Sequence, residues 1–256
     1  MQKPSRETVF SALVESGKSG SDPRVAPALY ASWRDQVDPN DRMSLVADLN
    51  MHLDRVQSGP AGLMIVLGSE NNINIGATAA LGLALLMPNE GKSLFNGPEL
   101  VIKLGMSSPH METKIAALGG ILLLGDRRVM PLLRQPYRNL NSVERRELAF
   151  IDGHFVWAGV VEFWINCLED EPEEKWGRAL WALYDLPTRA PVVRDVERQF
   201  PAYRRLPDGK SQRIVKEWTI TEFGKVIEPR LRRLGQLETQ DPIMPKVLKA
   251  WGIESK

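Results

Sequence analysis

Histidine and cysteine are the side chains that most often hold metal ions or act as nucleophiles, and this chain has few of them. Its 256 residues include three histidines and one cysteine: His52, His110, His154 and Cys167. No histidine lies in a His-Glu-x-x-His arrangement, and no second cysteine completes a metal-ligand pair. We therefore expect no metal centre and no cofactor.

The tripeptide Gly-Lys-Ser, which ends a nucleotide-binding P-loop, occurs three times, beginning at Gly17, Gly91 and Gly209. A P-loop also needs a glycine five residues earlier, between a strand and a helix. The three positions that would carry that glycine hold Ala12, Leu86 and Arg204. Because no complete catalytic constellation is found in the chain, we expect a protein that is not an enzyme.

Tryptophans flank an acidic run in the second half of the chain. Two lie seven residues apart on one face of a predicted helix, two lie on the next predicted helix, and residues 169–174 between these pairs hold five carboxylates. Large aromatic side chains at helical spacing usually pack into a core. Together with acids they also form grooves that receive a basic or amphipathic peptide. The protein-binding candidates are Trp157, Trp164, Trp176, Trp181, Glu169, Asp170 and Glu171.

The segment that follows is basic. Residues 1–186 contain 18 basic and 23 acidic side chains, whereas residues 187–233 contain 12 basic and 6 acidic ones. Three interpretations are open: contact with nucleic-acid phosphates, a solvated surface, or pairing with the acidic run. The nucleic-acid-binding candidates are Arg194, Arg198, Arg204, Arg205, Lys210, Arg213, Arg230, Arg232 and Arg233.

The elements that position these residues are predicted by an internal repeat. The tetrapeptide Ala-Ala-Leu-Gly occupies residues 79–82 and returns 37 residues later at 116–119, each time followed by large aliphatic residues. Small residues on one side let a helix approach its neighbours closely, and large residues on the other side fill the space between layers. This pattern is typical of buried helices.

After each copy, a polar break precedes a second apolar helix. The breaks are Asn-Gly-Pro at 96–98 and Gly-Asp at 125–126, and Pro98 suits a first helical turn. Over residues 76–133 the chain resembles armadillo and HEAT repeats, which alternate an Ala/Leu-rich helix with a second helix. The resemblance implies an all-α fold, a right-handed superhelix of stacked helix pairs, and it is silent on activity.

Further helices are expected on both sides of this stretch. Ser5 and Asn40 are predicted N-caps, residues 213–221 alternate like a strand, and Pro229 is expected to bend or split the last basic helix. We expect a helical-repeat domain over residues 1–200 and, over 201–256, either a basic, strand-containing C-terminal cap or a small separate module. The predicted helices are 6–15, 25–36, 41–57, 143–152, 154–168, 173–184, 191–200 and 222–234.

The remaining composition points to an ordinary intracellular protein. The longest apolar stretches, 61–68, 75–87 and 115–125, are too short to cross a bilayer, which needs roughly 20 residues. A single cysteine and no signal-peptide pattern favour a cytoplasmic location. We expect a protein-binding scaffold or adaptor whose partner is another protein. The alternative is a protein that associates with DNA or RNA through the arginine-rich segment.

Overall fold

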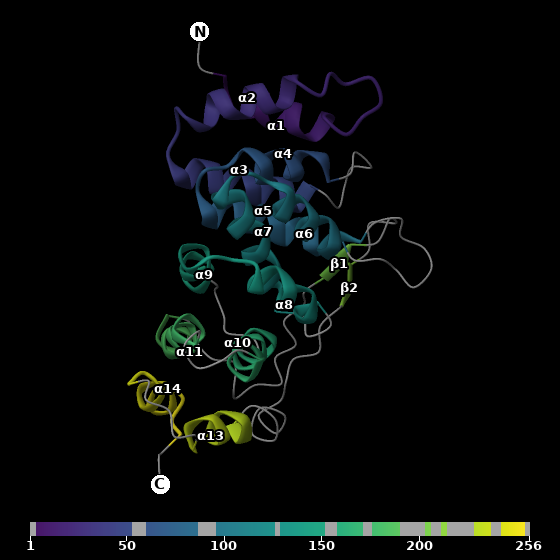
Figure 1. Cartoon of the computed structure of the whole chain (residues 1–256). Coiled ribbons are helices and arrows are strands. Elements are labelled where there is room, and N and C mark those ends of the chain that lie inside the picture. Colours follow the sequence, from purple (N-terminus) through teal and green to yellow (C-terminus); the bar gives the residue numbers. More distant parts are fainter. Residues whose placement is uncertain are drawn as a thin grey trace. The chain divides into compact units, whose positions relative to one another are not determined.

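In the residues that it describes, the computed structural model is helical apart from one pair of short strands, which confirms the all-α class (Figure 1). It describes residues 4–52, 60–86, 96–125, 129–151, 158–170, 176–189, 203–205, 211–213, 228–236 and 242–253. Within these residues no helix is both long and apolar enough to cross a membrane. The chain forms two compact units. Unit 1 comprises Met1–Leu124 and Ala202–Ile214, and unit 2 comprises Gly125–Pro201 and Val215–Lys256.

Unit 1 is a stack in which helices contact the next helix but one. Contacts of this kind join α1 to α3, α2 to α4, α3 to α5 and α5 to α7. Its helices are α1 (Arg6–Glu15), α2 (Val25–Arg34), α3 (Pro39–His52), α4 (Ala61–Ser69), α5 (Ile73–Ala84), α6 (Gly97–Ser107) and α7 (Met111–Leu124). The strands β1 (Tyr203–Arg205) and β2 (Ser211–Arg213) pair antiparallel.

Polar side chains begin several of these helices. Ser5 caps α1 as predicted, accepting a hydrogen bond from the Thr8 backbone N–H at 3.2 Å. The prediction that Asn40 caps α3 is wrong. Asp38 precedes that helix, and its carboxylate accepts the backbone N–H groups of Asn40 and Asp41 at 2.7 and 3.1 Å. Asp38 takes this position because α3 begins at Pro39, which needs no hydrogen bond for its own nitrogen.

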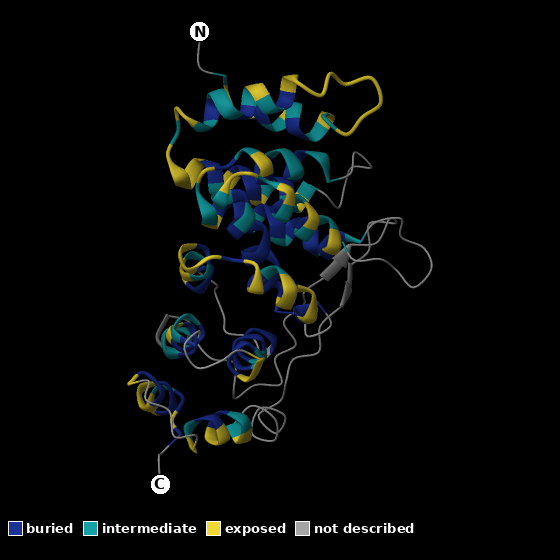
Figure 2. Ribbon diagram, in the orientation of Figure 1, coloured by how far each residue is buried: buried dark blue, intermediate teal, exposed yellow. Residues whose placement is uncertain are grey.

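The two copies of the tetrapeptide lie in α5 and α7, which pack directly against each other and are largely buried (Figure 2). The approach is close because small residues meet. A Cβ on Gly120 would lie 2.4 Å from the Ala80 Cβ and 2.8 Å from the Ala77 carbonyl oxygen. A Cβ on Gly76 would lie 2.8 Å from the Ala116 Cβ. The expectation that the small residues of the repeat permit close helix contact is therefore confirmed.

Unit 2 contains two rows of helices. One row places α8 (Met130–Arg138) against α10 (Ala158–Asp170), and the other places α9 (Ser142–Ala149), α11 (Gly177–Arg189) and α14 (Met244–Ala250) in sequence (Figure 1). The rows meet where α10 contacts α11, and α13 (Glu228–Gln236) contacts α14. Pro229 lies in the first turn of α13, where a missing N–H is tolerated, so it does not split the described helix.

Aromatic rings fill the core of unit 2. Tyr137, Phe163 and Trp164 meet edge to face, with ring centroids 4.9–5.6 Å apart. Beyond α14, the buried indole of Trp251 donates a hydrogen bond to the Leu183 carbonyl at 2.7 Å. This contact attaches the C-terminal end of the described chain to α11.

Parts of the sequence-based organisation lie outside the described residues. These include the predicted helix 191–200 and the boundary at residue 201. The predicted strand 213–221 overlaps β2 at Arg213, and its remaining residues are also outside them. Strand β1 lies outside the predicted strand 213–221, at Tyr203–Arg205. The strand pair groups with unit 1, whereas α13 and α14 group with unit 2.

Candidate protein-binding site

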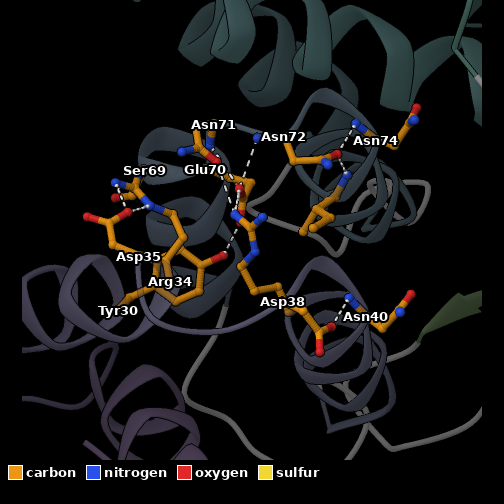
Figure 3. A network of polar contacts seen from close by, with 12 residues as sticks. Tyr30, Arg34, Asp35, Asp38, Asn40, Ser69, Glu70, Asn71, Asn72 and Asn74 are labelled. Atoms are coloured by element: carbon orange, nitrogen blue, oxygen red, sulfur yellow. Dashed lines mark hydrogen bonds and ion pairs between the residues drawn. The ribbon is translucent and has the colours of Figure 1, made fainter. Parts of the chain in front are cut away.

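The most deeply buried charge of unit 1 is the carboxylate of Glu70, at the end of α4 (Figure 3). Tyr30 O–H donates to Glu70 Oε2 at 2.6 Å, and Arg42 Nη1 donates to Oε1 at 2.6 Å. The backbone N–H groups of Asn71 and Asn72 donate to the same Oε1, each at 2.9 Å. Every Glu70 oxygen is thus hydrogen-bonded within the chain, as a buried carboxylate requires.

These contacts tie two helices, α2 and α3, to the turn between α4 and α5. Tyr30 comes from α2 and Arg42 from α3, and Arg42 also donates to Asn71 Oδ1 at 3.0 Å. Burial, followed by the neighbouring charge of Glu70, raises the pKa of Tyr30, so the phenol keeps the proton that it donates. Arg34 of α2 adds a bond to the Ser69 carbonyl. The network explains how the turn is held.

A second charged group, here called the Glu169 cluster, lies in unit 2 and consists of Glu162, Asn166, Glu169, Arg230 and Arg233. Arg230 Nη2 donates to Glu169 Oε2 and to Asn166 Oδ1, each at 2.6 Å. Arg230 Nη1 lies 3.7 Å from Glu162 Oε1. Arg233 Nη2 donates to Glu169 Oε1 at 2.6 Å. Burial raises the pKa of Glu169, but the hydrogen bonds and charges of both arginines outweigh it, so the pKa is lowered overall.

Asp170 meets arginines from a different helix. It pairs with Arg134 of α8 and lies 3.7 Å from Arg138. The described acids of the acidic run are therefore in contact with arginines on both sides, from α8 and from α13.

The four tryptophans do not form one surface. Trp164 and Trp176 are 1% and 7% exposed and belong to the core, because α8, α10 and α11 pack around this part of unit 2. These two tryptophans therefore cannot line the predicted groove. Trp181 is 42% exposed on α11, and its indole meets the Tyr184 ring edge to face at 5.7 Å. Trp157 and Glu171 lie outside the described residues.

The predicted phosphate-binding arginines divide into three groups. Arg230 and Arg233 pair with Glu169, and Arg232 pairs with Glu228 at 2.7 Å one turn away on the same helix. Arg204, Arg205 and Arg213 lie on β1 and β2, where Arg213 is the register partner of Tyr203. Pairing of the basic segment with the acidic run, one of the three interpretations, is observed for α13. Arg194, Arg198 and Lys210 lie outside the described residues.

The residues first considered for chemistry have local roles where the structure describes them. His52 packs edge to face on Phe10, with ring centroids 5.3 Å apart. Lys18 of the first Gly-Lys-Ser tripeptide pairs with Glu15 at 2.7 Å. Across the described part of the chain, no group of three His, Cys, Asp or Glu residues is arranged to hold a metal ion.

Sequence reasoning missed the Glu70 network altogether. The available signal was a lone acid placed two residues after the apolar stretch 61–68, in a polar break between two buried helices. A charge in that position needs a buried partner, but the sequence does not indicate that Tyr30 and Arg42 supply it.

Comparisons of the chain with protein-family models, with curated proteins and with solved structures find no match.

Proposed function

We propose that this chain is a non-enzymatic scaffold that binds another protein through the aromatic face of α11. The observation that carries the proposal is the exposed indole of Trp181 beside Tyr184. The other tryptophans that the structure describes, Trp33, Trp164, Trp176 and Trp251, are buried. Tryptophan and tyrosine dominate the binding energy of protein interfaces, because they bury a large area with few rotatable bonds.

The stacking of the helices supports a scaffold. In each unit, helices contact the next helix but one, as they do in armadillo and HEAT proteins. We propose that the pairs continue as a right-handed superhelix, which offers partners an elongated surface.

Cys167 is buried in α10 and is the sole cysteine, which supports a reducing, cytoplasmic location.

The charged clusters support binding rather than catalysis. Glu70 and Glu169 each accept hydrogen bonds from arginines of the same chain. A general base needs a carboxylate that can reach the substrate's proton, and here both groups would first have to give up these contacts.

The test begins with the full-length tagged protein purified from its own host, washed at low and at high salt. We expect a protein partner in stoichiometric amount that survives the high-salt wash. With the purified partner, Trp181→Ala should weaken binding at least about 30-fold, the effect of losing an interface hot spot. The control is Met51→Ala, which removes an exposed apolar side chain from unit 1. This variant should change the affinity for the partner by less than about twofold.

Two results would overturn the proposal. One is the absence of a stoichiometric protein from both washes. The other is a Trp181→Ala variant that folds normally by circular dichroism and binds the partner with wild-type affinity.

The strand pair favours a second candidate, association with DNA or RNA. Its register brings three arginines onto one short ribbon: Arg204, Arg205 and Arg213. The same preparation distinguishes this function, because nucleic acid bound through phosphates is released as salt rises. Neutralising Arg204, Arg205, Arg232 and Arg233 together should then abolish its recovery, and unchanged recovery would exclude this candidate.

A further inference from the structure

Helix α13 is attached to its two neighbours by opposite kinds of contact. Leu231, Leu234 and Gly235 share one helix face, and both leucines are buried. Gly235 abuts Leu248 of α14 so closely that a Cβ would lie 2.4 Å from Leu248 Cδ1. Toward α10, α13 makes the charged and polar bonds of the Glu169 cluster.

Helix α14, by contrast, is held by apolar burial. Val247 is fully buried, and the buried Trp251 that follows the helix donates its indole N–H to the Leu183 carbonyl. Salt screens charged contacts but leaves apolar ones intact or strengthens them. The attachment of α13 to α10 therefore responds to salt in the opposite sense from the attachment of α14 to α11.

We infer that α13 is a salt-sensitive strap, which opens from α10 as a local unit while α14 stays in place. Helix α13 has nine residues, and isolated helices shorter than about 12 residues are marginal in water. Once the Glu169 cluster is broken, α13 retains its apolar contact with α14 but loses its charged contact with α10, so its helical hydrogen bonds open more often. Opening exposes the Glu162, Asn166 and Glu169 side chains of α10.

This strap goes beyond the proposed function, because it holds whether or not Trp181 contacts a partner. Its test is hydrogen exchange of the full-length chain, read by mass spectrometry on peptides from α10, α13 and α14. In Glu169→Gln we expect α13 amides to exchange about fourfold faster than in the wild type, because a partly exposed ion pair contributes only modestly to stability. The α14 amides should keep their wild-type rates.

A matched control changes a glutamate that pairs within α13. Glu228 bonds Arg232 at the i,i+4 spacing, so Glu228→Gln should change α13 exchange by no more than about twofold. In 1 M salt, wild-type α13 should exchange as fast as α13 of Glu169→Gln, whose rate should change little with salt.

Either of two outcomes overturns the strap. If α13 and α14 accelerate together in Glu169→Gln, the C-terminal helices open as one body. If α13 exchange is the same in the wild type and in Glu169→Gln at all salt concentrations, the Glu169 cluster does not hold the helix.

Discussion

Units 1 and 2 place their helices in the same next-but-one order, yet they hold them with different chemistry. In unit 1, glycine and alanine bring the backbones of α5 and α7 close together, and the main ion pair, Arg42 with Glu70, is buried. In unit 2, aromatic rings fill the core, and the ion pairs between helices are partly exposed. The same stacking order is thus compatible with close backbone packing and with large side chains.

This difference between the two units predicts which substitutions each unit tolerates. A helix interface made of backbone atoms cannot move aside for an added methyl group, whereas surface arginines can change conformation. A buried carboxylate must keep all its donors, whereas a partly exposed one can be rehydrated.

The largest expected effect tests the two carboxylates against each other. Glu70→Gln should lower the free energy of unfolding by about 3–5 kcal/mol, because Arg42 is left with an unpaired buried charge. Glu169→Gln should lower it by less than about 1 kcal/mol, because solvent screens the Glu169 cluster. Urea denaturation followed by circular dichroism measures both.

The double variant Arg42→Met with Glu70→Gln also removes the unpaired charge of Arg42. Its free energy of unfolding should therefore be higher than that of Glu70→Gln alone. Equal losses in Glu70→Gln and Glu169→Gln would show that burial does not distinguish the two units.

An intermediate effect is expected at the α5–α7 contact. Gly120→Ala should destabilise unit 1 by about 2 kcal/mol, because the new Cβ meets backbone atoms of α5 and forces the helices apart. The matched control is Gly68→Ala in α4, where a Cβ meets nothing within 4 Å. That change should stabilise the helix by up to about 1 kcal/mol. Thermal or urea melts of the two variants should shift in opposite directions, and a stabilising Gly120→Ala would contradict close packing.

The smallest expected effect is a pH dependence in unit 2. The folded pKa of Glu169 is lowered, so its stabilising contribution is present above the unfolded pKa of about 4.3 and is lost as pH falls through the folded value. The difference in unfolding free energy between wild type and Glu169→Gln should therefore shrink toward zero in acid. A difference that grows as the pH falls would mean that the arginines do not favour the charged form.

Local patterns predicted the elements that depend on neighbours in sequence. The bounds of α1, the Ser5 cap and the start of α6 at Asn96 and Pro98 all follow from residues within one helical turn. The repeat also identified the helices that pack most closely. By contrast, α14 was missed, because seven residues with a proline near the start carry little periodicity.

The candidate site was less predictable, because its contacts join residues far apart in the chain. Arg230 and Glu169 are 61 positions apart, and Tyr30 and Glu70 are 40 apart. The sequence left pairing of the basic segment with the acidic run as one of three interpretations, and it did not indicate which side chains meet. It also could not separate exposed Trp181 from buried Trp164, since both occur at helical spacing beside apolar residues.

The glycine and alanine contact between α5 and α7 has a further consequence for conformational entropy. Neither side chain has rotamers to lose on folding, whereas an ordered arginine loses up to about 2 kcal/mol of rotamer freedom. The entropy lost at this contact therefore belongs to the backbone, and it is greatest at Gly120, whose unfolded chain has the widest choice of dihedral angles. Ala77, Ala80 and Ala116 lose less backbone entropy on folding than a glycine does, and they have no side-chain rotamers to lose. Among residues with a side chain, alanine therefore fills this contact with the smallest loss of entropy.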